Sequence, residues 1–214
     1  MKFNQALYFI TDSSDLEEDK FLNIVEEALI GGVDLIQLRE KTKSDREFLD
    51  IAFKIKNLTD KYNTPLIIDD RIDIALIVDA SGIHLGQDDI NIKYARKILG
   101  KDKIIGSTTK TLSQAIEAEN DGADYLGVGA IFNTTTKVKT IITKISTLNE
   151  ICDNTNIPVF AIGGINDINY KVLENSNING ICTVSAIMKS ENPREYTKEF
   201  KEKISNMIKN KSTV

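Results

Sequence analysis

Two pairs of adjacent carboxylates have the residue types and spacing to do chemistry in this chain. Asp69 and Asp70 follow the apolar run LII, and Asp88 and Asp89 follow GIHLGQ, which holds the only histidine, His84. Carboxylate oxygens suit a hard divalent cation, and Mg²⁺ typically takes one or two of them while keeping sites for water and phosphate oxygens. Two acid pairs brought together without a cation would repel each other. The pairs therefore predict a Mg²⁺ site wherever the fold brings them together.

Other polar residues suit phosphate groups. Cationic and hydroxyl side chains bind phosphate oxygens, and here they are Arg39, Lys41, Thr134, Thr136 and Lys137. Gly163-Gly164 and the small-residue turn at Ser185 would expose backbone N–H groups, as phosphate sites in β/α barrels commonly do. The pattern indicates a Mg²⁺–diphosphate region and a separate monophosphate cradle, and so two phosphorylated substrates.

Each feature also has an ordinary structural interpretation. Acid pairs at helix starts often serve as N-caps, and a Gly-Gly pair is more often a turn than a phosphate site. His84 cannot form a multi-histidine metal site, and a lone histidine is more often a satisfied structural residue than a catalyst. Cys152 and Cys182 lack metal-ligand spacing and are predicted to be structural. The functional interpretation depends on the joint placement of these residues at successive strand ends.

The elements that must position them are eight short apolar runs. Within each run apolar residues follow one another instead of alternating with polar residues, and this pattern predicts a buried parallel strand. The runs are LYFIT from Leu7, VDLIQL from Val33, PLIID from Pro65, GIHL from Gly82, KIIGS from Lys103, DYLGVG from Asp124, PVFAIGG from Pro158 and GICTVSA from Gly180. Segments with helical spacing lie between them, as in 22–30 and 48–58.

Eight strands alternating with helices, with no linker or shift in composition, predict an α/β fold: one (β/α)8 TIM-barrel domain over residues 1–214. In such a barrel the polar residues at the strand ends would converge on one mouth. Segment 133–144 is rich in Thr and Lys, and its apolar residues fit neither the helical nor the strand periodicity. It is predicted to be a mobile loop after the sixth strand.

Capping and turn signals mark some helix ends. Ser44 precedes DREF, and Glu47 three residues later completes the pattern of a capping box. Gly31-Gly32 and Gly122 are predicted to end helices in the left-handed conformation.

Composition bounds the function classes. A formal net charge of -5 and a pI near 5.1 give no general attraction to nucleic acid or to an anionic membrane, so any anion must be bound by a local site. The apolar part of the N-terminus is too short for a signal peptide, and no run approaches the length of a membrane span. We therefore expect a cytoplasmic protein with small-molecule partners, no nucleic-acid or membrane partner, and compatibility with a homodimer.

The ordered motifs of the chain resemble the thiamine-phosphate synthase family over nearly its full length. They are YFIT (8–11), QLREK (37–41), DDR (69–71), GIHLGQDD (82–89), DGADYLGVGAIF (121–132), TTTK (134–137), AIGGI (161–165) and VSAI (184–187). The resemblance implies a (β/α)8 enzyme with Mg²⁺ as cofactor. Such an enzyme joins hydroxymethylpyrimidine diphosphate to a thiazole monophosphate and releases thiamine phosphate and diphosphate.

Carried over residue by residue, the resemblance implies that Asp70 and Asp89 are the Mg²⁺ ligands. The substrate contacts it implies are Gln37, Arg39, Lys41, Asp69, Thr108, Thr134, Thr136, Lys137, Gly164, Val184 and Ser185. Of these, Lys41, Lys137 and Thr108 are expected to act in catalysis. The lysines and the metal would neutralise the leaving diphosphate, and the thiazole nitrogen would then attack the carbon left behind.

Some positions depart from the family pattern. Asp69 stands where an asparagine is usual, and Thr108 stands where a serine is usual. Ala130 and Asn133 replace prolines of the lid loop, and the glycine that normally follows the TK pair is missing.

Three alternatives stay open at the level of sequence. A thiazole tautomerase shares the barrel but needs no metal, and it uses a histidine after the fifth strand, where this chain has Lys110. A non-catalytic binder of thiazole phosphate or thiamine phosphate would fit the altered lid and Asp69. An isomerase or aldolase would require a poised acid–base pair or a Schiff-base lysine inside a strand. No lysine lies in the interior of a predicted strand, since Lys103 only begins the run KIIGS.

Overall fold

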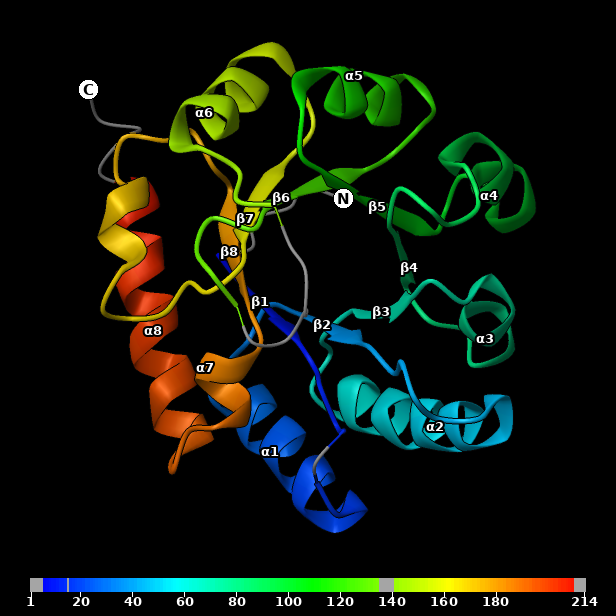
Figure 1. The fold of residues 1–214 in the computed structure, drawn as a ribbon. Helices are drawn as coiled ribbons and strands as arrows, with labels where there is room; N and C mark the ends of the chain where they lie inside the picture. Colours follow the sequence, from blue (N-terminus) through cyan, green and yellow to red (C-terminus); the bar gives the residue numbers. More distant parts are fainter. Residues whose placement is uncertain (1–5, 15, 135–140, 210–214) are drawn as a thin grey trace.

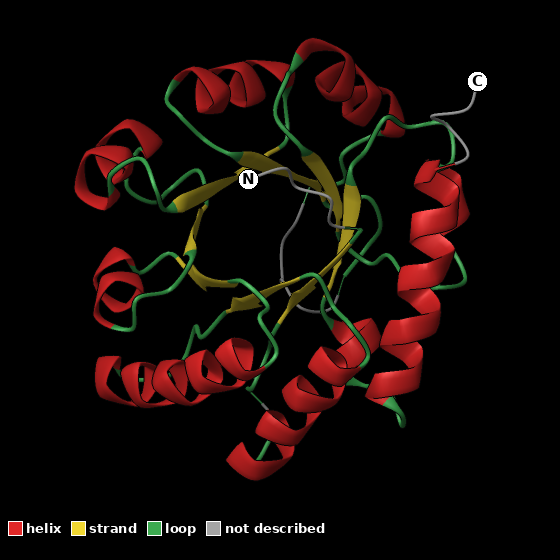
Figure 2. Cartoon of the chain, turned by 180° about the vertical axis from the view of Figure 1, so that it is seen from behind, coloured by secondary structure: helices red, strands yellow, loops and turns green. Residues whose placement is uncertain are grey.

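The computed structural model describes residues 6–14, 16–134 and 141–209, in which eight parallel strands close into a barrel. The strands pair in chain order, and β1 closes the ring against β8, with Leu7 opposite Ile181 and Phe9 opposite Thr183. Helices surround this ring, as Figure 1 shows along the barrel and Figure 2 shows from behind. The predicted (β/α)8 barrel is confirmed.

All eight predicted strands are present. They are β1 (Leu7–Ile10), β2 (Leu35–Leu38), β3 (Leu66–Asp69), β4 (Gly82–Leu85), β5 (Ile104–Thr109), β6 (Tyr125–Gly129), β7 (Val159–Ile162) and β8 (Gly180–Thr183). The helices are α1 (Glu18–Ile30), α2 (Asp45–Lys61), α3 (Ile72–Ile77), α4 (Ile92–Leu99), α5 (Leu112–Asn120), α6 (Ile145–Asn154), η1 (Tyr170–Leu173), α7 (Ser185–Met188) and α8 (Pro193–Lys209). Among the described helices, none is both long and apolar enough to cross a membrane.

The connection between β7 and β8 departs from the predicted alternation, because it holds the short 3₁₀ helix η1 instead of an α-helix. Asn166 and Asn169 explain the difference. The Asn166 side chain accepts hydrogen bonds from the N–H groups of Ile168 and Asn169, and the Asn169 side chain accepts one from the N–H of Asn166. Such local side-chain bonds compete with the backbone bonds of a helix.

The capping box at the start of α2 is confirmed. Ser44 Oγ accepts from the N–H of Glu47, and the Glu47 carboxylate accepts from the N–H of Ser44 at 2.8 Å. Gly32 and Gly122 have the predicted left-handed φ, at 88° and 97°. Gly31 ends α1 as predicted, but its φ of -66° is not left-handed, so that part of the prediction is wrong. Gly31 is needed for space instead, since a Cβ there would lie 2.5 Å from a backbone oxygen of α8.

Two apolar clusters hold the fold together. The larger one lies between the strands and the surrounding helices. The smaller one comprises Tyr8, Ile10, Leu35, Ile67, Ile104, Tyr125, Phe160 and Cys182, and these residues come from the strands alone. The rings of Tyr8, Tyr125 and Phe160 pack edge to face, with centroids 5.6 to 5.8 Å apart. The smaller cluster therefore fills the inside of the barrel and forms a floor for its mouth.

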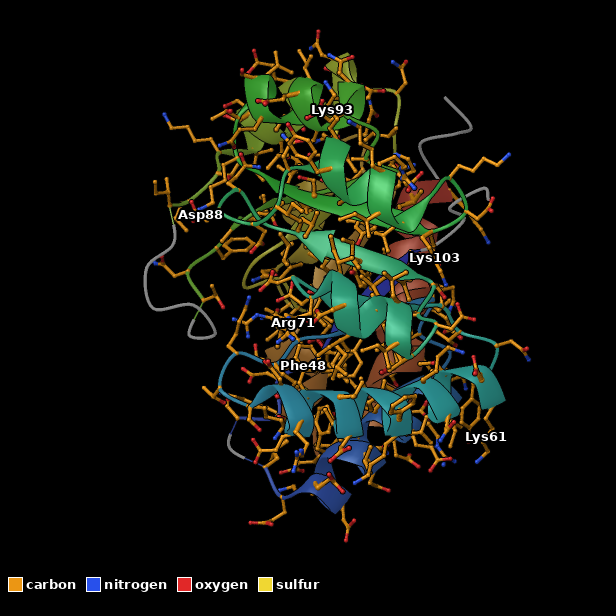
Figure 3. The ribbon with its side chains drawn as sticks, turned by 90° about the vertical axis from the view of Figure 1, so that its right-hand side faces the viewer. Phe48, Lys61, Arg71, Asp88, Lys93 and Lys103 are labelled. Atoms are coloured by element: carbon orange, nitrogen blue, oxygen red, sulfur yellow. The ribbon has the colours of Figure 1, made fainter. Side chains whose placement is uncertain are left out.

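The two ends of the barrel differ in what they display. Figure 3 shows the barrel from the side, with Asp88, which follows β4, at one end. Lys61 at the end of α2 and Lys103 before β5 lie at the other end. The end marked by Asp88 is the one at which the strands finish, where β/α barrels place their active sites.

Candidate functional site

A pocket of about 540 Å³ lies at the end where the strands finish. It is lined by the predicted residues Gln37, Arg39, Lys41, Asp69, Asp70, Asp88, Asp89, Thr108, Thr134, Gly164, Val184 and Ser185. Thr136 and Lys137, and part of the predicted loop 133–144, lie outside the described residues. The fold thus brings together every predicted site residue that the structure describes.

Asp70 and Asp89 present two carboxylates to one another. Burial raises the pKa of Asp89, and the neighbouring Asp70 carboxylate raises this pKa further. The N–H of Gly86 donates to Asp89 Oδ2 at 2.6 Å and offsets part of this rise. Asp70 has a φ of 59°, in the left-handed region that Asp tolerates better than most residues. Two acids held this close form a donor pair whose repulsion a hard cation would relieve.

The donor set fits Mg²⁺ better than it fits a metal held by protein ligands alone. Within the described residues, no three histidine, cysteine or acidic side chains gather into a metal-binding group. Mg²⁺ keeps several waters and is usually bound through one or two carboxylates together with substrate phosphates. Asp70 and Asp89 supply such a pair, whereas Asp88 is exposed at the rim of the same pocket.

Asp69 has a different environment from Asp70. Asp69 is only 7% exposed, and its carboxylate lies 3.0 Å from Lys41 Nζ and 3.8 Å from Arg39 Nε. Burial raises the pKa of Asp69 to about 6; the charge of Asp70 adds to this rise, and Lys41 opposes it. Asp69 therefore holds two cationic side chains in place at the pocket wall.

Lys41 connects Asp69 at the end of β3, and Asp70 directly after it, to the open part of the pocket. It forms ion pairs with both Asp69 and Asp70, and its side chain is 41% exposed. Burial alone would lower the pKa of Lys41, but the two carboxylates outweigh that effect and raise it. Lys41 thus carries a positive charge next to the proposed cation site, in a molecule whose net charge is negative.

A chain of hydrogen bonds runs beneath the mouth. Gln37 Nε2 donates to the Tyr8 hydroxyl at 2.6 Å, and that hydroxyl lies 2.8 Å from the hydroxyl of Tyr125. The Tyr125 hydroxyl lies 3.0 Å from His84 Nδ1, and His84 Nε2 lies 2.8 Å from Thr108 Oγ1. Sequence reasoning gave His84 a structural role and did not single out the tyrosines. The signal was a tyrosine inside an apolar strand, whose hydroxyl needs a partner once it is buried.

The glycines and the short helix α7 border the side of the pocket predicted to hold a monophosphate. Gly163 and Gly164 have left-handed φ values of 101° and 66°, and a Cβ on Gly164 would lie 2.6 Å from the Asn133 carbonyl. Val184 precedes α7 and Ser185 begins it. The first N–H groups of a helix have no partner within that helix. The role of these residues as a phosphate cradle stays a prediction.

The strands themselves bear on the alternative of a Schiff-base enzyme. None of the eight described strands contains a lysine, as predicted. Lys110, which stands where the tautomerase would have its histidine, follows β5 and lines the pocket.

The two cysteines form no disulfide, and Cys182 lies buried inside the barrel, where burial raises the pKa of its thiol.

Comparisons with known proteins agree with this geometry. A family model described as thiamine monophosphate synthase matches residues 7–187. The thiamine-phosphate synthase of Clostridium tetani is 50% identical over 195 residues, which cover 91% of this chain and 93% of the relative. The enzyme of the same name from Methanobrevibacter smithii is 47% identical and covers 92% of this chain and 96% of its own length.

A solved structure shares the whole architecture. The thiamine phosphate pyrophosphorylase from Pyrococcus furiosus superposes with a TM-score of 0.85 at 38% identity, covering 96% of this chain and 97% of that one. More distant solved barrels, such as a geranylgeranylglyceryl phosphate synthase from Thermoplasma acidophilum at 16% identity and a TM-score of 0.68, share the fold alone.

Proposed function

The chain belongs to the thiamine monophosphate synthase family and is a transferase of thiamine biosynthesis, and from this premise we propose its substrates and the roles of its residues. The substrates are hydroxymethylpyrimidine diphosphate and a thiazole monophosphate, and the products are thiamine phosphate and diphosphate. The observation that carries the proposal is the pair of adjacent carboxylates, Asp70 and Asp89, in one pocket with the charged Lys41.

Asp70 and Asp89 would hold Mg²⁺, which when bound would neutralise the negative charge that gathers on the departing diphosphate. Lys41 donates to the diphosphate oxygens from the neighbouring wall, and Asp69 keeps Lys41 and Arg39 directed there. The electron-rich aminopyrimidine stabilises the cation left on its own carbon. The reaction therefore requires neither a protein nucleophile nor a strong base.

The remaining residues act by positioning. Gln37 and Thr108 contact the pyrimidine, while Gly164 and the turn at Val184 and Ser185 bind the thiazole phosphate through N–H groups. Holding the thiazole nitrogen at near-attack distance from the carbon supplies a large part of the acceleration. Thr134 contacts the substrates from the pocket wall. Thr136 and Lys137, which lie outside the described residues, are expected to complete the set of substrate contacts.

A direct assay tests this function. Purified protein is mixed with both substrates and Mg²⁺, and thiamine phosphate is measured with and without EDTA. We expect product in the presence of the metal and a fall in rate of about a hundredfold or more with EDTA. The reason is that stabilisation of transition-state charge by a bound metal amounts to several kcal/mol. Product formed equally well with EDTA would contradict the Mg²⁺ assignment. Tight binding of the substrates without any product would instead favour the non-catalytic binder.

The partners we propose are these two small phosphorylated molecules. A cytoplasmic location and a homodimer stay predictions.

A further inference from the structure

We propose that the hydrogen bonds of the chain beneath the mouth are all donated in one direction, from Gln37 towards Thr108. Tyr8, Tyr125 and His84 are the positioning residues that maintain this direction. They make the Thr108 hydroxyl a donor and the Gln37 amide oxygen an acceptor toward the pyrimidine ring. This inference rests on the proposed function for the identity of the ligand, and its geometry comes from the strands alone.

The three positioning residues are buried, so each of their polar groups depends on a hydrogen-bond partner within the protein. Tyr8 and Tyr125 are fully buried, and His84 is 7% exposed. Burial raises the pKa of both tyrosine hydroxyls well above the ordinary value of 10, so each keeps its one hydrogen at neutral pH. A buried hydroxyl whose hydrogen or lone pair is left without a partner destabilises the arrangement that leaves it so.

The direction follows from counting hydrogens. The Tyr8 oxygen accepts from Gln37 Nε2, so its own hydrogen is directed to the Tyr125 oxygen. The single hydrogen of Tyr125 is then directed to His84 Nδ1, which must be unprotonated to accept it. A neutral imidazole in this state carries its hydrogen on Nε2, and that hydrogen is donated to Thr108 Oγ1. The hydrogen of Thr108 is therefore directed away from His84.

The opposite direction would change both ends of the chain together. If Gln37 offered its oxygen to Tyr8, each bond would reverse, His84 would carry its hydrogen on Nδ1, and Thr108 would donate inward. A mixture of the two directions would place two hydrogens, or two lone pairs, against each other within a buried contact. The chain therefore links the mouth groups of Gln37 and Thr108, so that one presents an acceptor while the other presents a donor.

This pairing suits an aminopyrimidine. Its amino group is a hydrogen-bond donor, and the ring nitrogen beside it is an acceptor. The ligand is therefore matched by one acceptor and one donor on the protein. A pyrimidine bearing an oxo group in place of the amino group would offer the reverse pattern, and a fixed direction would disfavour it.

The surrounding strands reserve room for the chain. A Cβ on Gly106 in β5 would lie 2.1 Å from Tyr125 Cζ, so any larger residue would displace that ring. A Cβ on Gly127 in β6 would lie 3.3 Å from His84 Cε1. Phe160 packs edge to face against both tyrosines and holds their rings in orientation. The chain is thus built into the barrel wall and does not depend on mobile surface groups.

The first test uses the fact that the chain has one histidine. Protein labelled with ¹⁵N at histidine gives a single pair of ring-nitrogen NMR signals, which report directly which nitrogen carries the hydrogen. We expect an unprotonated Nδ1 and a protonated Nε2 in the free protein and with bound pyrimidine diphosphate. A hydrogen on Nδ1, or an even mixture of both forms, would overturn the proposed direction. This measurement does not depend on turnover, so failure of the proposed direction can be distinguished from failure of the proposed function.

The second test breaks the chain at its centre. Tyr125→Phe removes the hydroxyl that joins Tyr8 to His84 without touching the mouth. We expect both histidine forms to become populated and the KM for the pyrimidine diphosphate to rise about tenfold, because one neutral hydrogen bond loses its orientation. The KM for the thiazole phosphate should stay unchanged.

Tyr196→Phe is the matched control. It also removes a tyrosine hydroxyl that forms hydrogen bonds, in this case with Asp167 on the outside of the barrel. We expect it to leave the histidine signals and both KM values as in the wild type. Equal effects of the two variants on the KM for the pyrimidine diphosphate, or Tyr125→Phe with unchanged histidine signals, would overturn the positioning role.

Discussion

At the scale of single residues, the acids around the mouth divide between two tasks. Asp70 and Asp89 present carboxylates to each other, whereas Asp69 is buried against Lys41 and Arg39. Sequence could predict that both acid pairs reach one mouth, because both follow strands. The residue pattern alone could not predict which acid of each pair faces the other pair, and only the family resemblance pointed to Asp70 and Asp89. The geometry depends on the left-handed turn at Asp70 and on the exposure of Asp88.

Glu40 gives a pH-dependent prediction at this scale. Burial raises the pKa of Glu40 above its ordinary value of 4.5, although its hydrogen bond from Ser13 partly opposes this. The folded protein therefore binds this proton more tightly than the unfolded chain does. The stabilisation is present below pH 4.5 and is lost as pH rises through the folded pKa. The melting temperature of the wild type should thus fall relative to that of Glu40→Gln as pH rises from about 4 to 7.

Glu47→Gln provides a control of opposite sign. Hydrogen bonds from Ser44 lower the pKa of Glu47, so its stabilisation is present above its ordinary pKa and is lost as pH falls. The wild type should therefore gain stability relative to Glu47→Gln over the same rise in pH. Parallel trends for the two variants would refute the assignment for Glu40.

At the scale of elements, strands were predicted better than the segments that join them. Continuous apolar runs identify buried parallel strands, and the capping box identified the start of α2. Segment 165–179 was less predictable because Asn166 and Asn169 bond to their own backbone and leave only the 3₁₀ helix η1. A left-handed conformation was wrongly predicted for Gly31. Glycine is required there because the chain packs closely against α8, and that contact is distant in sequence.

The capping box gives a prediction for α2, the helix that follows the loop carrying Lys41. Ser44→Ala removes the hydroxyl that accepts from Glu47 N–H, at a cost of about 1 kcal/mol. For a protein of this size that cost lowers the melting temperature by about 2–4 °C. Ser44→Asp keeps a capping oxygen and should melt near the wild type. Equal melting of the wild type and Ser44→Ala would show that the cap contributes nothing.

At the scale of the whole molecule, closure of the barrel turns distant residues into one site. The bonds of the buried chain join residues that are 24 to 117 positions apart. No local pattern marks such pairs, so sequence located Gln37 and Thr108 at the mouth but not the path between them. Likewise, a net charge of -5 excluded general attraction to anions, and only the fold shows how Lys41 and the acid pair form a local site.

The central claim is that Asp70 and Asp89 share a Mg²⁺ that binds diphosphate, and calorimetric titration with inorganic diphosphate tests it most directly. Asp89→Ala is compared with Asp88→Ala, which removes an exposed acid from the same pocket. We predict that the wild type and Asp88→Ala bind diphosphate only with Mg²⁺ present. Asp89→Ala should bind it about a hundredfold more weakly, a loss of about 3 kcal/mol. Equal affinities of the two variants, or wild-type binding that is unchanged by EDTA, would contradict the account.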